Sequence, residues 1–280
     1  MQDNQIVNKI YHSTFETKDV SSLSLYIDNE VFEYAFLKAG SKEVATIVSV
    51  SLASLSAHKS NADKVKQLIF HHKLNSYEKV NVFISLGNST YTIVPSAFSV
   101  QGNEASLLNF SNGKNTEIVR SEKFKEMQFI YGPDPELISL LEKEFKNAVI
   151  RHSGSTAIEL FFSNPSLKNA DIWINIEAAS FELLAGKGKK LLFYNRFEFS
   201  GNEDILYYLL FMMEQYQLDS EKIRLYLSGT IEVGDALHSL LKKYIRHISF
   251  AVNAVRFTDA EWKLPEHAYF TLLNQHLCGS

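Results

Sequence analysis

The feature of this sequence that most constrains its fold is an internal repeat. Residues 25–28 (LYID) and 31–34 (VFEY) flank a turn, and the same arrangement returns at residues 174–177 (INIE) and 180–183 (SFEL). Each copy continues with a polar turn, a further β-like run, a helical pattern and a strand that ends in glycine. This order predicts a duplicated α/β fold, built from two βββαβ-type halves with mixed sheets flanked by helices.

The most linker-like stretch is residues 163–166, where Asn and Pro lie between two serines. We therefore expect two domains, residues 1–165 and residues 166–280. Hydrophobic periodicity and turn residues place the elements of each half. In the first half we expect strands at residues 23–27, 31–37, 43–52, 79–86, 90–94, 124–131 and 148–152, and helices at residues 62–74, 135–145 and 155–162. In the second we expect strands at residues 171–176, 181–185, 190–199, 223–227 and 248–252, and helices at residues 202–216, 235–244 and 265–277.

The turn at residues 87–88 and the helix at residues 202–216 have distinctive sequences. Gly87 and Asn88 separate two of the strands, and because both tolerate positive φ we expect a hairpin or tight reversal there. The helix at residues 202–216 is apolar almost all round, which predicts that it is covered on both sides. Its Met and aromatic residues also fit a groove for a partner, although core packing is the simpler interpretation. They are Tyr207, Tyr208, Phe211, Met212, Met213 and Tyr216.

Composition narrows the classes of function. The 280 residues carry 28 Lys and Arg against 32 Asp and Glu, a net charge of −4, so no positive field favours nucleic acid or an anionic membrane. The longest apolar run, residues 205–213, is shorter than the roughly 20 residues that cross a bilayer, so no membrane insertion is expected. The single Cys278 excludes an intrachain disulfide, and residues 1–5 lack the pattern of a secretory leader. We expect a cytoplasmic protein.

The pattern resembles the actin-like ATPase superfamily, in which two ribonuclease H-like halves face each other across a cleft. More narrowly, residues 192–199, 203–210 and 225–229 look like an uncharacterised bacterial family, a domain of unknown function. That family is similar in fold to the cytoplasmic actin-like scaffold of type IV pilus assembly. The resemblance implies a fold, and it carries no established reaction.

In working members of the superfamily the first strand of each half ends in an acid that is closely followed by glycine. The resemblance implies that the turn's N–H groups cradle phosphate while the acid holds Mg²⁺ through water. Here Asp28 and Glu177 stand at the acid positions, and neither turn contains glycine. The turn expected to contact adenosine is reduced to Ser228, Gly229 and Thr230.

We therefore expect a degenerate nucleotide site, with no catalytic residue, no metal and no cofactor, in a scaffold that binds a protein partner. The alternative is a divergent ATPase or phosphotransferase that uses Asp28 and Glu177 around Mg²⁺ with ATP. A third interpretation adds Asp171 and Glu182 as a nuclease-like carboxylate cluster, and ordinary turn and surface acids are the simpler explanation.

Residues 153–156 (SGST) precede a helix and follow Arg151 and His152. Their N–H groups suit an anion, because the N-terminus of a helix attracts negative charge. Helix capping is a simpler explanation of the same residues, and we favour it.

Overall fold

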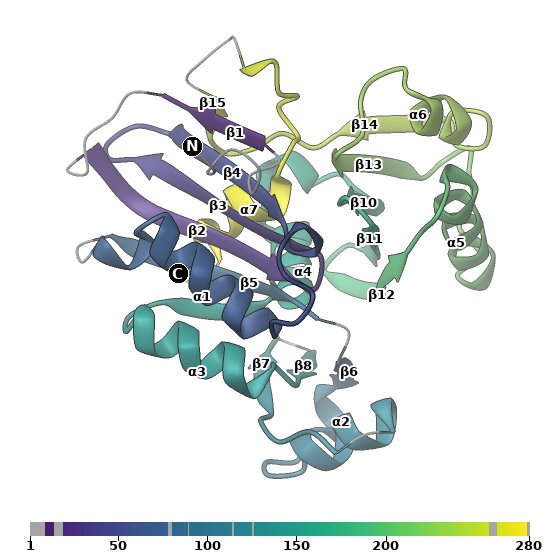
Figure 1. Ribbon diagram of the computed structural model, residues 1–280. Coiled ribbons are helices and arrows are strands. Elements are labelled where there is room, and N and C mark those ends of the chain that lie inside the picture. Colours follow the sequence, from purple (N-terminus) through teal and green to yellow (C-terminus); the bar gives the residue numbers. More distant parts are fainter. Residues whose placement is uncertain are drawn as a thin grey trace. The chain divides into compact units, whose positions relative to one another are not determined.

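The computed structural model describes residues 9–13, 19–77, 80–88, 90–113, 115–124, 126–257 and 262–278 (Figure 1). The chain divides into two compact units. The first is Met1–Ser41 with Ala45–Ser155, and the second is Lys42–Val44 with Thr156–Ser280. The division falls inside helix α4 (Ser153–Ser163). The expected limit between residues 1–165 and 166–280 stays a prediction.

The main sheet of the first unit has the order β1-β4-β3-β2-β5-β9 (Figure 1). Its strands are β1 (Lys9–His12), β2 (Val20–Asp28), β3 (Val31–Lys38), β4 (Glu43–Ser51), β5 (Asn81–Gly87) and β9 (Val149–His152). β2 pairs with β3 antiparallel and with β5 parallel. The short β15 (Arg256–Phe257) pairs with Glu43 and Val44, which belong to the second unit.

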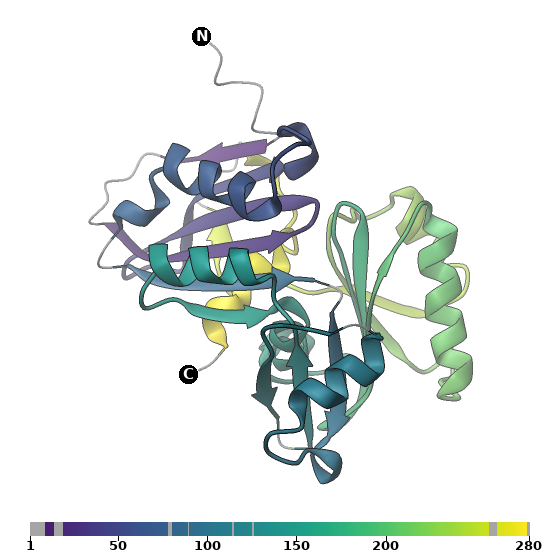
Figure 2. The same ribbon diagram turned by 60° about the horizontal axis from the view of Figure 1, so that its bottom comes forward.

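One face of this sheet carries the core of the first unit. Helices α1 (Asn61–His71) and α3 (Pro135–Glu144) lie side by side there (Figure 2). The side chains of a strand alternate between the two faces of the sheet, so every second residue of β2 and β5 joins this core. The central members are Leu23, Leu25, Ile27, Ile84, Val65, Leu68, Ile69, Ile138 and Leu141.

A second, three-stranded sheet of the first unit shows that the expected hairpin at Gly87 is wrong. β6 (Tyr91–Pro95) pairs with β8 (Met127–Tyr131), which pairs in turn with β7 (Arg120–Lys123), and α2 (Glu104–Asn112) packs beside them. Asn88 explains the change of direction. Its side-chain amide donates to Gly132 O at 2.6 Å, and its backbone carbonyl oxygen is 2.8 Å from Nε2 of His152. The chain therefore leaves the main sheet instead of folding back along it.

The second unit repeats the plan with a sheet of order β12-β11-β10-β13-β14. These strands are β10 (Ile172–Ile176), β11 (Ser180–Lys187), β12 (Lys190–Glu198), β13 (Arg224–Gly229) and β14 (His247–Phe250). Helices α5 (Asn202–Gln215) and α6 (Ala236–Leu241) share one core with a face of this sheet. The mixed sheets flanked by helices confirm the predicted fold class.

Two helices of the second unit differ from expectation. α5 is not covered on both sides, because Tyr207, Phe211 and Tyr216 are 62%, 50% and 41% exposed. The predicted helix at 265–277 is only α7 (Phe270–Asn274) followed by a short 3₁₀ turn, Gln275–Leu277. Tyr269 has a left-handed φ of 53°, which a continuous right-handed helix cannot contain.

Candidate functional site

The pairing of the strands shows that the two units also share buried polar residues at matching positions. In each unit the first strand of the repeat, β2 or β10, carries a polar residue that has a carboxylate opposite it and a serine beside it. The positions are Tyr26, Glu33 and Ser85 in the first unit, and Asn175, Glu182 and Ser228 in the second. Both carboxylates and both serines are buried. In this register Asp28 and Glu177 are equivalent, so the two predicted acids occupy matching turns of different units.

The carboxylate of Asp28 holds its own turn. Its Oδ1 accepts hydrogen bonds from the backbone N–H groups of Glu30 at 2.8 Å and Val31 at 2.7 Å. The hydroxyl of Tyr26 donates to Oδ2 at 3.3 Å. An aspartate that bonds its own backbone in this way replaces the hydrogen bonds of a tight turn. The N–H groups that a phosphate would need at this turn therefore already have an acceptor.

Glu33 is a second buried acid in the first unit, and no sequence motif indicates it. Burial raises the pKa of its carboxyl to about 7, and the nearby charge of Asp28 adds to the rise. A hydrogen bond from Ser49 Oγ to Glu33 Oε1, at 2.8 Å, and the charge of Lys9 act in the opposite direction. Glu33 therefore titrates near neutral pH.

This shift predicts a pH-dependent stability. Between about pH 4.5 and pH 7 the folded chain holds the Glu33 proton more tightly than the unfolded chain, so the free energy of unfolding falls as pH rises. A rise of this size corresponds to about 3 kcal/mol, at about 1.4 kcal/mol per pKa unit. We expect Glu33→Gln to gain about that much stability relative to the wild type between about pH 4 and pH 8, measured by urea unfolding. A stability difference that does not change with pH would contradict this prediction.

In the second unit a chain of hydrogen bonds leads from the core to Glu177. Trp173 Nε1 donates to Ser228 Oγ at 2.9 Å, and Ser228 Oγ donates to Asn175 Oδ1 at 2.7 Å. Asn175 Nδ2 then donates to Glu177 Oε1 at 2.8 Å, and it also lies 3.1 Å from the hydroxyl of Thr271. Buried polar groups are tolerated when they are bonded in this way. Ser228, predicted as a ligand-contacting residue, is fully buried within this chain of bonds.

Glu182 joins the same network from β11. Its Oε1 accepts from the hydroxyl of Tyr194 at 3.0 Å, and its Oε2 lies 3.4 Å from Asn175 Nδ2. A carboxylate that is only 2% exposed needs such donors, because an unpaired buried charge is costly. Glu182 is therefore a buried acid that is bonded within this unit, and not one of the turn and surface acids that the simpler explanation expected.

Gly229 is placed by packing against the neighbouring strand. Its φ is +90°, and a Cβ added there would lie 1.9 Å from the carbonyl oxygen of Ile176. Thr230 N donates to the same oxygen at 2.9 Å, while Gly229 N donates to His267 O at 2.9 Å. The parallel pairing of β10 and β13 thus brings Glu177, Gly229 and Thr230 to one end of one sheet. These backbone groups are bonded within the protein.

At both turns, backbone N–H groups are bonded to acceptors of the chain itself. The amides of the Asp28 turn bond to Asp28, and Glu177 N donates to Ser180 O at 2.8 Å. The two turns also carry the carboxylates of Asp28, Glu30 and Glu177, and negative charge repels a phosphate. Among the described residues no group of three or more His, Cys, Asp or Glu is arranged to hold a metal ion. Whether Asp28, Glu177, Ser228, Gly229 and Thr230 contact any ligand stays a prediction.

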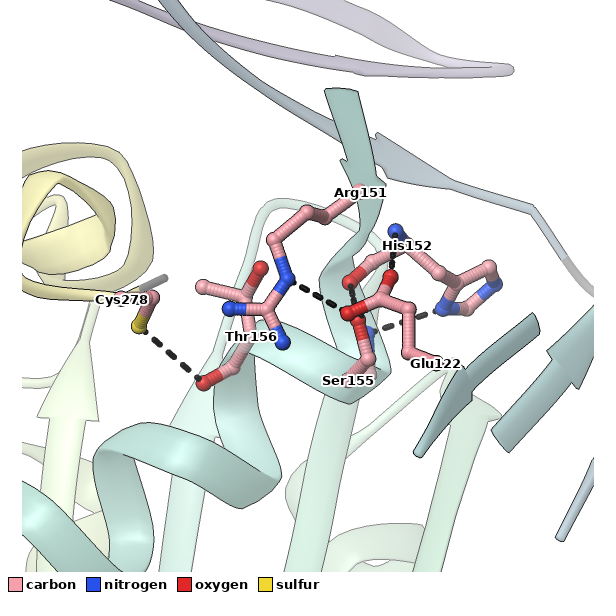
Figure 3. A network of polar contacts seen from close by, with 7 residues as sticks. Glu122, Arg151, His152, Ser155, Thr156 and Cys278 are labelled. Atoms are coloured by element: carbon pink, nitrogen blue, oxygen red, sulfur yellow. Dashed lines mark hydrogen bonds and ion pairs between the residues drawn. The ribbon is translucent and has the colours of Figure 1, made fainter. Parts of the chain in front are cut away.

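The start of α4 is organised around Glu122 of β7 (Figure 3). Its carboxylate pairs with Arg151 Nε at 2.5 Å and accepts from Ser155 Oγ at 2.7 Å. His152 is fully buried, and its Nδ1 accepts from Gly154 N at 2.9 Å. A carboxylate of the protein therefore lies beside the start of α4, bonded to the side chains of Arg151 and Ser155. In the second unit Cys278 Sγ contacts Thr156 O at 3.9 Å (Figure 3).

The two units with their mixed sheets and flanking helices have the actin-like ATPase fold, which the solved structures described below share. Residues 12–248 match the model of the family described as "Protein of unknown function (DUF3822)". The chain belongs to this family, as the resemblance predicted. Among curated proteins none matches the sequence. No helix of the described residues has the length and apolar character needed to span a membrane.

Three solved structures are similar to this chain in fold. A Bacteroides thetaiotaomicron VPI-5482 protein with actin-like ATPase fold and unknown function is 20% identical, with a TM-score of 0.71, covering 85% of this chain and 94% of that one. A chain of the PilM–PilN type IV pilus biogenesis complex is 14% identical, with a TM-score of 0.60, covering 92% and 97%. The cytoplasmic domain of EpsL, an inner membrane component of the Vibrio cholerae type II secretion system, is 12% identical, with a TM-score of 0.50, covering 92% and 95%.

Proposed function

We propose that this protein is a non-catalytic scaffold or protein-binding module that keeps the actin-like fold without a working nucleotide site. The observation that carries the proposal is the turn at Asp28, where the acid accepts the N–H groups of Glu30 and Val31. A phosphate at this turn would have to displace a carboxylate that is fixed by the chain itself. The structural similarity to a chain of the PilM–PilN complex supports a protein partner. The expected cytoplasmic location stays a prediction.

The first test is titration calorimetry of the full chain with ATP and Mg²⁺. We expect no heat of binding at micromolar concentrations, and no phosphate release above that of buffer. Micromolar affinity that Asp28→Ala abolishes would contradict the proposal and favour the divergent ATPase. In that case Glu177→Ala should abolish phosphate release as well, because the alternative needs both acids.

We predict instead that Asp28→Ala acts on stability. Removing the carboxylate leaves the buried N–H group of Val31 without its acceptor, which costs about 1–3 kcal/mol. It also removes the acceptor of the N–H group of Glu30, an exposed residue whose N–H can bond to water instead. Asp28→Asn keeps the Oδ1 acceptor and should lose less than half of that amount. Urea unfolding of the three proteins measures the difference. Equal stability of Asp28→Ala and the wild type would show that the turn does not depend on this acid.

The second test concerns the partner. We expect a tagged full-length chain to co-purify with a protein in a binary complex that can be rebuilt from purified components. Prior treatment with apyrase, which removes ATP and ADP, should leave the affinity of the rebuilt complex unchanged. A complex that forms only with bound nucleotide would contradict the proposed scaffold.

A further inference from the structure

The exposed side of α5 forms an aromatic groove with β12. A pocket of about 560 Å³ opens between them and is lined mainly by aromatic side chains. The aromatic groove consists of Phe193, Phe197, Tyr207, Tyr208, Phe211 and Tyr216, with Asn195, Met212 and Gln215 completing its wall. All of these residues belong to the second unit.

Helical spacing explains why this groove is open. Tyr207 and Phe211 are one turn apart on the face of α5 that points away from its core residues Ile205, Leu209 and Met212. A surface helix ordinarily carries polar residues on that face. Here the outward stripe is aromatic, and apolar area exposed in one contiguous patch is typical of an interaction site.

The rings of the groove are ordered in parallel pairs. Phe197 and Tyr208 stack with their centroids 3.9 Å apart and an angle of 16° between the rings, and Tyr207 and Phe211 stack at 6.1 Å and 18°. Tyr207 and Phe211 are at least half exposed. The π faces of aromatic rings attract cations, and Arg is the cation that stacks on them best.

The charged residues of α5 and of the segments that flank it are acidic. Residues 197–221 contain six Asp and Glu and no Lys or Arg. Asp204 is used in capping α5, and Asp219 and Glu221 form ion pairs with Lys222 and Arg246. Glu198, Glu203 and Glu214 are exposed, and within the described part of the chain none of the three forms an ion pair. Glu203 and Glu214 extend the outward stripe of α5 beyond Tyr207 and Phe211.

We propose that the aromatic groove binds a segment of a partner protein in which Arg or Lys residues flank large apolar side chains. The apolar side chains fill the pocket, and the cations stack on the exposed rings and face the carboxylates of Glu203 and Glu214. The same acidic rim repels nucleic acid and anionic lipid headgroups, so a basic protein segment is the occupant. This assignment rests on the proposed function as a protein-binding module. It specifies which surface of this protein binds and what kind of segment the partner presents.

The test uses a library of short random peptides displayed on phage, selected against the full chain, followed by synthetic peptides of the enriched sequences. We expect enrichment of Arg or Lys next to Leu, Phe or Trp. Fluorescence anisotropy should then show binding that weakens as salt rises, because exposed charge pairs are screened. Enrichment of acidic or purely polar peptides, or no enrichment at all, would overturn the proposal.

Matched variants locate the binding. Tyr207→Ala and Phe211→Ala should each weaken the enriched peptides by at least tenfold, as expected of aromatic residues at the centre of an interface. The double variant Glu203→Gln with Glu214→Gln should weaken them about threefold or more and reduce the salt dependence. The controls are Tyr244→Ala, another exposed aromatic of this unit, and Glu126→Lys, an exposed acid of the other unit. Both should bind as the wild type does.

The outcomes separate this assignment from the proposed function. Peptides that bind equally well to Phe211→Ala and to the wild type would overturn the aromatic groove while leaving a binding module in place. ATP binding with phosphate release would contradict the proposed function, whatever the peptides do. A dimer that forms with rising concentration and is lost in Phe211→Asp would assign the aromatic groove to a second copy, which also overturns the proposal. Thermal unfolding of each variant confirms that the fold is retained.

Discussion

Gly229→Ala is expected to destabilise the second unit by more than about 4 kcal/mol. Single substitutions reach losses of this size only by mechanisms such as overpacking or backbone strain, and both apply here. The added Cβ would lie 1.9 Å from the Ile176 carbonyl oxygen and within 3 Å of two further backbone atoms of that residue. Because these atoms belong to the backbone of β10, no side chain can move aside. The parallel pairing of β10 with β13 would have to open.

Gly234→Ala is the matched control for this prediction. Gly234 has a φ of +87°, close to the +90° of Gly229, but a Cβ there meets nothing within 4 Å. Gly234→Ala should therefore lower the stability only by the strain of a positive φ at alanine, about 1–2 kcal/mol. Hydrogen exchange localises the effect, and we expect lost protection in β10 and β13 of Gly229→Ala while β2 and β5 keep theirs. Equal effects of the two substitutions would show that Gly229 is required only for its φ.

Trp173→Ala is the second substitution with a large expected effect, about 3–5 kcal/mol, as for other buried aromatic residues cut back to alanine. Trp173 is fully buried and makes an edge contact with Phe270, with centroids 5.2 Å apart. Its Nε1 also donates to Ser228, at the start of the bonds that reach Glu177. The substitution therefore removes both packing and a buried donor.

Trp173→Phe separates the two contributions. Phenylalanine keeps most of the packing and lacks the indole donor, so we expect a loss of about 1–2 kcal/mol from the unmade hydrogen bond. Combined with Ser228→Ala, this variant should lose less than the sum of the single losses, because both remove the same bond. Urea unfolding measures all four proteins. Additive losses would show that the Trp173–Ser228 bond does not contribute to stability.

Sequence patterns predicted most of the architecture, because strand alternation and turn residues are local signals. The repeated turns at Asp28 and Glu177 lie at matching positions of the two hairpins, as the repeat indicated. The hairpin expected at Gly87 was wrong, because the bonds of Asn88 to Gly132 and His152 join residues far apart in the chain. α5 was expected to be covered on both sides because it is apolar almost all round. The structure leaves Tyr207 and Phe211 on one side exposed, and the composition of a helix does not predict such an exposed apolar face.

The candidate site was only partly accessible from the sequence. Asp28 and Glu177 were found from their positions, whereas Glu33 and Asn175 were missed. A usable signal existed, because both lie inside strands whose other residues are mostly apolar, and a polar residue there needs a partner. The identity of that partner depends on the neighbouring strand and is not a local property.

The sequence alone determined the duplication, the absence of glycine from both acid turns and the acidic character of residues 197–221, since each is a matter of residue order and charge. Only the tertiary structure decided what those residues contact. In the structure the backbone N–H groups of Glu30 and Val31 donate to the carboxylate of Asp28, and Gly229 packs against the backbone of Ile176. The aromatic side of α5 is exposed. The physical reason is that hydrogen bonds and close packing act between atoms brought together by strand pairing, which sequence distance does not record.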